Sequence, residues 1–330
     1  KHAPYLFFMG VGEYAIVKDK WRNIEVDYYV EKEYEPFAKQ IFGNTPEMIE
    51  FFSKRLSYDY PWSKYAQITG RDFVSGAMEN TTATLHQESA QQKPGDLIDE
   101  NRWEDTIAHE LFHHWFGDLV TAESWSNLTV NESFANYSQY LWNEHKYGKD
   151  IADYGLMKEI RGYMMDPSNI SKDLVRFNYH SREDMFDGVS YNKGGAILHM
   201  LRNYVGDDAF FAGLTDYLKT NEFGTGEAHQ LRLSLEKISG KDLNWFFNQW
   251  YFGNGNPKIS YTTSFEPVKK EVTITLSQNQ IGQNFQFPLA IDIFENGKPT
   301  RKNVWVSAKE KNDFTFQVSK NPDLVNLNSD

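Results

Sequence analysis

Residues 103–116 read WEDTIAHELFHHWF, with apolar side chains recurring every three or four positions. This period predicts an amphipathic helix, which we place from about Asp99 to Phe116. His109 and His113 are four residues apart in it, so they fall on one face, one above the other. Both imidazoles can therefore reach a single metal ion, and Glu110 is left between them to act on a bound water.

A third ligand must come from another part of the chain, because a catalytic zinc has three protein ligands and an open position. Eighteen residues separate Glu132 from His113, and Glu132 lies at the start of a second predicted helix over about 131–146. A glutamate there is ordinarily a first-turn residue favoured by the helix dipole, but the gap allows an antiparallel return to the histidines. We predict one zinc ion per chain, held by His109, His113 and Glu132, with Glu110 as general base. His114 lies about 100° further round the helix and should not share the metal.

The composition narrows the possible classes of protein. The 330 residues are 40% hydrophobic, 24% charged and carry a net charge of −12, which argues against a nucleic-acid surface. No apolar run is long enough for a membrane-spanning helix. The absence of cysteine excludes disulfides, thiolate zinc sites and a thiol nucleophile. The composition leaves the cellular compartment open.

The pattern of the chain changes at Gly253-Asn254-Gly255-Asn256-Pro257. Before it, further helices are expected at about 153–165, 191–205, 207–220, 227–238 and 241–250. After it come short alternating segments, which predict strands at 259–265, 271–276, 285–294, 303–307 and 314–318. We therefore predict an α+β protein with a catalytic domain over 1–253, made of a mixed sheet lobe and a mainly helical lobe. A small β-sandwich follows over 254–330.

The beginning of the chain has strand-like features. Lys1-His2-Ala3-Pro4 has no signal-peptide pattern, and Tyr5–Met9 looks like a strand entered in the middle of a fold, so we expect flanking domains to be missing. Thr45 is expected to be an N-cap, with Pro46 in the first turn of its helix. Residues 65–79 are predicted to form a strand that runs into Gly76-Ala77-Met78-Glu79-Asn80.

Several motifs together resemble one known family. They are His-Glu-x-x-His, eighteen residues and Glu132; the upstream Gly-Ala-Met-Glu-Asn; Trp115–Thr121; Asn131-Glu132; Tyr191-x-Lys193-Gly194; Asp242–Trp250; and Gly255-x-Pro257-x-Ile259. The set resembles the zinc aminopeptidases of the aminopeptidase N and leukotriene hydrolase family, a group of gluzincins. The resemblance runs from about Pro4 to Asn328, and it implies a thermolysin-like catalytic domain followed by the small sandwich.

The resemblance also implies roles for individual residues. Glu79 would bind the free α-ammonium of a peptide substrate, and Gly76, Ala77 and Met78 would align its backbone. Tyr191 would donate a hydrogen bond to the developing oxyanion. The expected activity is release of N-terminal residues from peptides by attack of a zinc-bound water. From the residues alone, Glu79 would more often be a solvent-facing loop carboxylate and Tyr191 a packing tyrosine.

The chain departs from the family pattern at several places. Phe112 and His114 replace a small residue and a glutamine, Thr81-Thr82 replace Trp-Gly, and Ser133 replaces a glycine. None of these changes removes a predicted ligand, the base or the oxyanion donor. They leave the preferred side chain at the first substrate position open.

Three other functions remain as alternatives. They are an epoxide hydrolase of the leukotriene type, an endopeptidase of the thermolysin type, and a non-catalytic scaffold related to the family. The endopeptidase gives no reason for the Gly-Ala-Met-Glu-Asn segment, and a scaffold history predicts lost zinc ligands, whereas all are present. Because flanking domains are expected to be missing, we expect this chain alone to bind zinc but to hydrolyse peptides poorly.

Overall fold

The computed structural model describes residues 2–327, so Asn328, where the resemblance ends, lies outside the described residues. The chain divides into two compact units, Lys1–Gly253 and Asn254–Asp330. Each is described by itself.

The first unit contains a five-stranded mixed sheet in the order β1-β2-β3-β5-β4. Strands β1 and β2 are antiparallel, β2, β3 and β5 are parallel, and β4 runs antiparallel to β5 at the edge. The central strand β3 is buried along most of its length, as expected for a strand covered on both faces. The strands are β1 Ala15–Trp21, β2 Ile24–Val30, β3 Lys64–Gly70, β4 Ala77–Met78 and β5 Ala83–Gln87.

Two of the strand predictions were wrong. The single strand expected over 65–79 is interrupted after Gly70 by a turn in which Asp72 has a φ of 57°, and β5 lies between the two pieces. Tyr5–Met9 is not a strand either, since Pro4–Leu6 is a short 3-10 helix and β1 begins only at residue 15. Strand-like composition alone does not form a strand where no described strand pairs with the segment.

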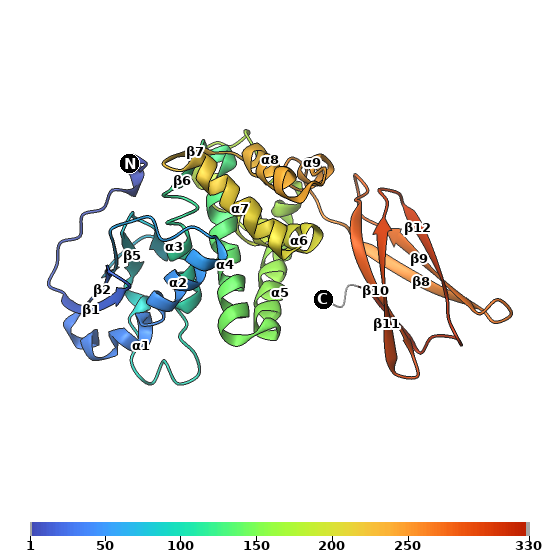
Figure 1. Ribbon diagram of the computed structural model, residues 1–330, viewed down its shortest axis with the longest axis horizontal. Helices are drawn as coiled ribbons and strands as arrows, with labels where there is room; N and C mark the ends of the chain where they lie inside the picture. Colours follow the sequence, from blue (N-terminus) through green and yellow to red (C-terminus); the bar gives the residue numbers. More distant parts are fainter. Residues whose placement is uncertain (1, 328–330) are drawn as a thin grey trace. The chain divides into compact units, whose positions relative to one another are not determined.

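Helices make up most of the rest of this unit (Figure 1). In Figure 1 the labelled strands β1, β2 and β5 lie with α1–α3 on one side of α4, and α5–α8 lie on its other side. Short strands β6 Val120–Ala122 and β7 Gly224–Gly226 pair in parallel. The helices are α1 Ala38–Phe42, α2 Thr45–Arg55, α3 Glu104–Phe112, α4 Thr129–Tyr147, α5 Lys149–Met165, α6 Gly194–Val205, α7 Asp207–Asn221, α8 Ala228–Ser239 and α9 Asn244–Trp250.

The ends of the motif helix and of α2 differ from the sequence prediction. Helix α3 starts later than Asp99, because Asn101 accepts hydrogen bonds from the backbone N–H groups of Trp103 and Glu104 and holds a turn before it. It ends at Phe112, yet His113 keeps helical dihedrals as the C-cap. In α2, Thr45 is the first helical residue rather than the N-cap, and its hydroxyl donates to the carbonyl of Phe42.

The second unit is an all-β module of two three-stranded antiparallel sheets, in the orders β11-β10-β13 and β12-β9-β8. Val272, Ile274 and Leu276 on β9 alternate with more exposed positions and are buried, as one face of a sheet requires. The last strand, β13, and the first half of β11 were not predicted from the sequence. The strands are β8 Ile259–Glu266, β9 Glu271–Gln278, β10 Phe287–Glu295, β11 Lys298–Val306, β12 Lys311–Gln317 and β13 Leu324–Leu327.

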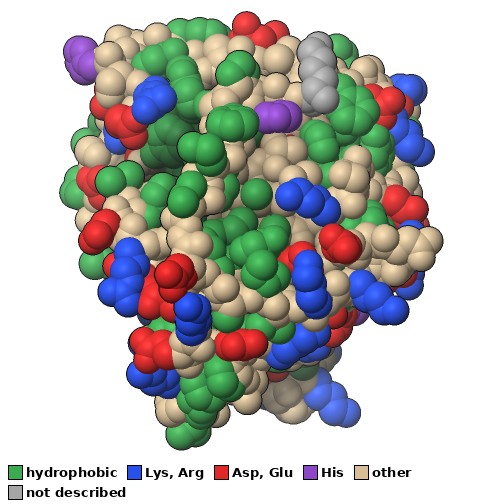
Figure 2. Space-filling model, turned by 90° about the vertical axis from the view of Figure 1, so that its left-hand side faces the viewer, with side chains coloured by type: hydrophobic (Ala, Val, Ile, Leu, Met, Phe, Trp, Pro, Cys, Tyr) green, Lys and Arg blue, Asp and Glu red, His purple; other side chains and the backbone are tan. Residues whose placement is uncertain are grey.

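The surface mixes charge signs and apolar groups. Figure 2 shows one face on which Lys and Arg side chains are interspersed with Asp and Glu among apolar patches. Within residues 2–327, no helix combines the length and the apolar character needed to cross a membrane.

Candidate active site

Helices α3 and α4 pack against each other in opposite directions. The Ser138 hydroxyl donates to the carbonyl of Ala108 at 3.1 Å, and the Trp142 indole donates to the Glu104 carboxylate at 2.7 Å. Residue numbers therefore rise along α4 as they fall along α3, which is the antiparallel return expected from the eighteen-residue gap. This packing brings the start of α4 to the end of α3, where His113 lies.

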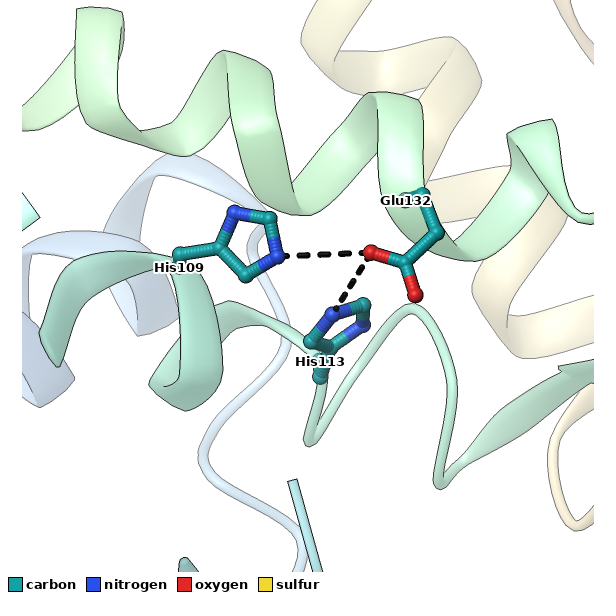
Figure 3. Close-up of side chains that lie close together, drawn as sticks. All are labelled: His109, His113 and Glu132. Atoms are coloured by element: carbon teal, nitrogen blue, oxygen red, sulfur yellow. Dashed lines mark ion pairs between the residues drawn. The ribbon is translucent and has the colours of Figure 1, made fainter. Parts of the chain in front are cut away.

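His109, His113 and Glu132 converge on one point (Figure 3). The Glu132 Oε2 atom lies 3.3 Å from His109 Nε2 and 3.4 Å from His113 Nε2. Donor atoms bound to a tetrahedral zinc at about 2.1 Å lie about 3.4 Å from one another. Although the distances are short, Oε2 takes no hydrogen bond of acceptable geometry, and all three side chains are buried. An orphaned carboxylate oxygen facing two ring nitrogens fits a cation between them better than two hydrogen bonds, so these residues could hold a metal ion.

The other ring nitrogens keep the histidines in the orientation that a metal needs. His113 Nδ1 lies 3.0 Å from the carbonyl oxygen of Phe116, so this nitrogen carries the proton and Nε2 is free to ligate. His109 Nδ1 lies 3.0 Å from the side-chain nitrogen of Gln139. The two amide orientations have nearly the same shape, and with the amide turned over the Gln139 oxygen accepts the Nδ1 proton and leaves Nε2 free to ligate. Gln139 was not predicted from the sequence. Its position seven residues after Glu132, two helical turns on the same face, was the available signal.

Glu79 and Glu110 lie next to His113. Ligand atoms of Glu79, Glu110 and His113 lie within 4.8 Å of one another, and all three residues are buried. Burial raises the pKa of Glu110 well above its usual value and also raises the pKa of Glu79, while the charge of His113 opposes both shifts. One oxygen of Glu110, Oε2, has no hydrogen-bond partner and is free to take a proton.

The pKa shifts of His113 and Glu132 indicate that this site favours positive charge. Burial acts to lower the pKa of His113, but Glu79 and Glu132 raise it well above its usual value. Burial acts to raise the pKa of Glu132, but His113 and then His109 hold it below its usual range. The neighbouring carboxylates thus favour positive charge at this site, which a bound cation would supply.

Tyr191 lies against His109, on a single π-helical turn, Val189–Lys193. Its ring stacks on the His109 imidazole with centroids 5.9 Å apart and planes inclined by 9°. Burial, followed by the charge of Glu132, raises the pKa of the phenol above its usual value, so the hydroxyl stays protonated as a donor. Single π turns inside helices are frequently found at functional sites.

Gly76, Ala77 and Met78 lie at the edge of the sheet. Ala77 and Met78 form β4, which pairs with β5 on one side and with no described strand on the other. The carbonyl of Gly76 accepts from the amide of Gln87 and closes this pairing. Buried Glu79 follows directly, so an open strand edge leads to a carboxylate beside the histidines.

Three further residues lie near the group formed by Glu79, Glu110 and the histidines. Asp118 is fully buried with no hydrogen bond to either oxygen, and burial and Glu79 raise its pKa well above its usual value. Burial and Glu79 likewise raise the pKa of Tyr5. His114 points away from the ligand atoms: its Nε2 accepts from the amide of Thr82 at 3.0 Å, and burial lowers its pKa to about 3. Asp118 and Tyr5 were not identified from the sequence.

Comparison with known proteins identifies the family. The model described as the Peptidase family M1 domain matches residues 41–250. The chain belongs to peptidase family M1. This confirms the family predicted from the motifs. The matched residues all lie in the first unit, which carries the histidines.

Individual M1 relatives agree with this assignment. Tricorn protease-interacting factor F2 of Thermoplasma acidophilum is 30% identical over 272 residues, which cover 80% of this chain and 34% of that protein. Aminopeptidase M1 of Arabidopsis thaliana is 28% identical, over 93% of this chain and 36% of its own length. The chain thus spans about a third of the length of these relatives.

A solved structure confirms the fold class. Legionella pneumophila aminopeptidase A, crystallised in complex with aspartic acid, superposes with a TM-score of 0.81 at 20% sequence identity. The match covers 94% of this chain and 36% of the other. At this identity the likeness shows the α+β fold alone.

Proposed function

We propose that this M1 chain is the catalytic part of a zinc aminopeptidase that releases N-terminal residues from peptides. The observation that carries the proposal is the convergence of His109, His113 and Glu132, with the carboxylates of Glu79 and Glu110 beside them. The first three residues match a zinc site in ligand type, number and spacing. A bound zinc ion supplies Lewis-acid polarisation of a carbonyl and a lowered pKa for the water next to it.

Glu110 is the proposed general base. Its unpartnered oxygen accepts a proton from the attacking water and then returns it to the leaving amine. The raised pKa of this buried carboxyl favours the first transfer, because a carboxylate with higher proton affinity takes the proton from water more readily. Tyr191, protonated and adjacent to His109, donates a hydrogen bond to the oxyanion as it develops.

Glu79 explains why the substrate would have a free amino terminus. A buried carboxylate within 4.8 Å of the ligand and base atoms is poorly solvated and gains strongly from an ammonium group placed against it. The scissile carbonyl then lies one residue from that terminus. The open edge of β4 offers backbone groups of Gly76–Met78 to an extended peptide, as in strand addition to a sheet.

Two measurements test this function. Zinc content by elemental analysis should reach one ion per chain, and a chain that takes up no zinc would contradict the ligand set. Hydrolysis should occur with an aminoacyl anilide but not with its N-acetylated counterpart, because acetylation removes the ammonium that Glu79 binds. Equal cleavage of both would remove the aminopeptidase assignment and favour an endopeptidase.

The same assay measures what residues 1–330 do alone. We propose that they bind zinc but turn over poorly. Full-strength turnover would overturn this expectation without affecting the proposed chemistry.

A further inference from the structure

Ser133 occupies a position between two functional elements. It directly follows the ligand Glu132 on α4 and is fully buried. Its hydroxyl donates to the backbone carbonyl of Ser190 at 2.6 Å, and Ser190 directly precedes Tyr191 on the π turn. One hydrogen bond therefore joins the neighbour of the proposed zinc ligand to the neighbour of the proposed oxyanion donor.

The direction of this hydrogen bond is determined by its surroundings. Ser133 Oγ and Thr129 Oγ1 lie 2.7 Å apart, and either could donate. Because the single proton of Ser133 is taken by the Ser190 carbonyl, which can only accept, the Thr129 hydroxyl must donate to Ser133. The chain Thr129 to Ser133 to Ser190 is thus oriented from α4 towards the π turn.

Packing holds the serine close to the turn. A Cβ placed on Gly194, the residue after the π turn, would lie 1.9 Å from Ser133 Oγ, so only a glycine allows this approach. Other hydrogen bonds also hold the π turn in place. The Asp187 carboxylate accepts from the amides of Val189 and Ser190. The Ser190 hydroxyl donates to the carbonyl of Met185. The Ser133 hydroxyl adds a hydrogen bond from the helix of the proposed ligand to this segment.

We propose that Ser133 is a positioning residue that sets the place of the Tyr191 hydroxyl relative to Glu132. This inference rests on the proposed function, in which Tyr191 stabilises the oxyanion. Ser133 touches neither substrate nor metal in this role and acts through the Ser190 carbonyl and the backbone that carries Tyr191. A glycine at position 133 would lack this contact, because it has no hydroxyl to donate.

The test is a double-mutant cycle in the zinc-loaded protein, with Ser133→Ala, Tyr191→Phe and the double variant. The readouts are kcat, KM and the affinity for a phosphinic dipeptide that imitates the tetrahedral transition state. Ser133→Ala should lower kcat and phosphinate affinity about tenfold with little change in KM, because a displaced donor loses a transition-state contact. In the Tyr191→Phe background the same change should cost less than about twofold, since the donor is already absent.

A control separates this role from loss of stability. Ser234→Ala removes another buried serine hydroxyl from a helix of the same unit, where the partner is Asp216. It should leave kcat and phosphinate affinity unchanged. Zinc affinity, measured by competition with a chelator, should be the same in Ser133→Ala as in wild type.

Each other outcome overturns a specific claim. Equal losses for Ser133→Ala with and without Tyr191→Phe would show that Ser133 does not act through Tyr191. Weaker zinc binding would show that it acts through Glu132 instead. If Tyr191→Phe alone changed nothing, the proposed role of Tyr191 would fail, and with it the basis of this inference.

Discussion

Two buried histidine clusters in the first unit are built in opposite ways. His86 on β5 receives a hydrogen bond from the Trp103 indole at Nδ1, and its Nε2 lies 3.0 Å from the Gln67 side-chain oxygen. The Gln67 amide in turn donates to the Thr45 hydroxyl. Every nitrogen of this ring therefore has a protein partner, and the tautomer is determined.

His109 and His113 differ because their Nε2 atoms pair with a carboxylate oxygen that makes no hydrogen bond. The Nε2 atoms face Glu132, whose Oε2 has no hydrogen bond, and Glu110 and Asp118 add further unpartnered buried oxygens. Leaving such groups unsatisfied costs free energy, so folding alone does not favour the arrangement. The hydrogen bonds of His86 therefore stabilise the fold, whereas the Nε2 atoms of His109 and His113 are placed where a ligand could bind.

The largest expected effect is on turnover by Glu110→Gln. The amide keeps the shape of the side chain but cannot take a proton from water, so kcat should fall by about 10²- to 10⁴-fold while zinc is retained. The check is steady-state kinetics together with elemental analysis of zinc. Glu104→Gln is the matched control, since Glu104 is a buried glutamate of the same helix that accepts from Trp142 and Asn44. It should keep kcat, and loss of metal from Glu110→Gln would make that residue structural.

The second-largest expected effect is a loss of stability when the metal is removed. A ligand at about 1,000 times its dissociation constant stabilises the folded state by about 4 kcal/mol. Chemical denaturation with zinc buffered at that excess, and again with a chelator, should show a difference of this order. His86→Gln should show the same difference, because its cluster does not contact the ion. Identical curves with and without the chelator would refute the metal site.

Gln139→Leu should weaken metal binding without abolishing it. The substitution removes the partner of His109 Nδ1, and loss of such a partner lowers metal affinity by about 10- to 100-fold. Competition with a chromogenic chelator measures this. Asn143→Leu, one turn further along α4 and bonded to Asp105 instead, should leave affinity unchanged. Equal affinities for wild type and Gln139→Leu would show that the amide does not orient the ligand.

The smallest effect concerns pH and the His86 cluster. Burial lowers the pKa of His86 to about 3, so between about pH 6.5 and 3 the unfolded chain binds a proton that the folded chain does not. The contribution of His86 to stability is therefore present above pH 6.5 and is lost as the pH falls, by up to about 1.4 kcal/mol per pH unit. The stability advantage of wild type over His86→Gln should shrink by this amount from pH 6 to 5. A constant difference would show that His86 is protonated in the fold.

Local sequence was enough to find the three residues that converge as the proposed metal ligands. The four-residue spacing on α3 and the eighteen-residue return to α4 depend on helix geometry and one short connection. The helices predicted to end at about 146 and 205 do end there, because Gly148 and Gly206 follow with a positive φ, 93° and 92°. The strand predicted at Tyr5–Met9 failed because pairing depends on a neighbour rather than on composition.

By itself, the sequence therefore determined the family, the α+β class and a set of residue types able to hold zinc. Only the tertiary structure decided which other groups meet them. Gln139 reaches His109, the edge of β4 brings Glu79 to His113, and Ser133 joins the turn of Tyr191. Periodicity sets which side of one helix a residue occupies, but contacts between distant segments arise only when those helices and strands pack together.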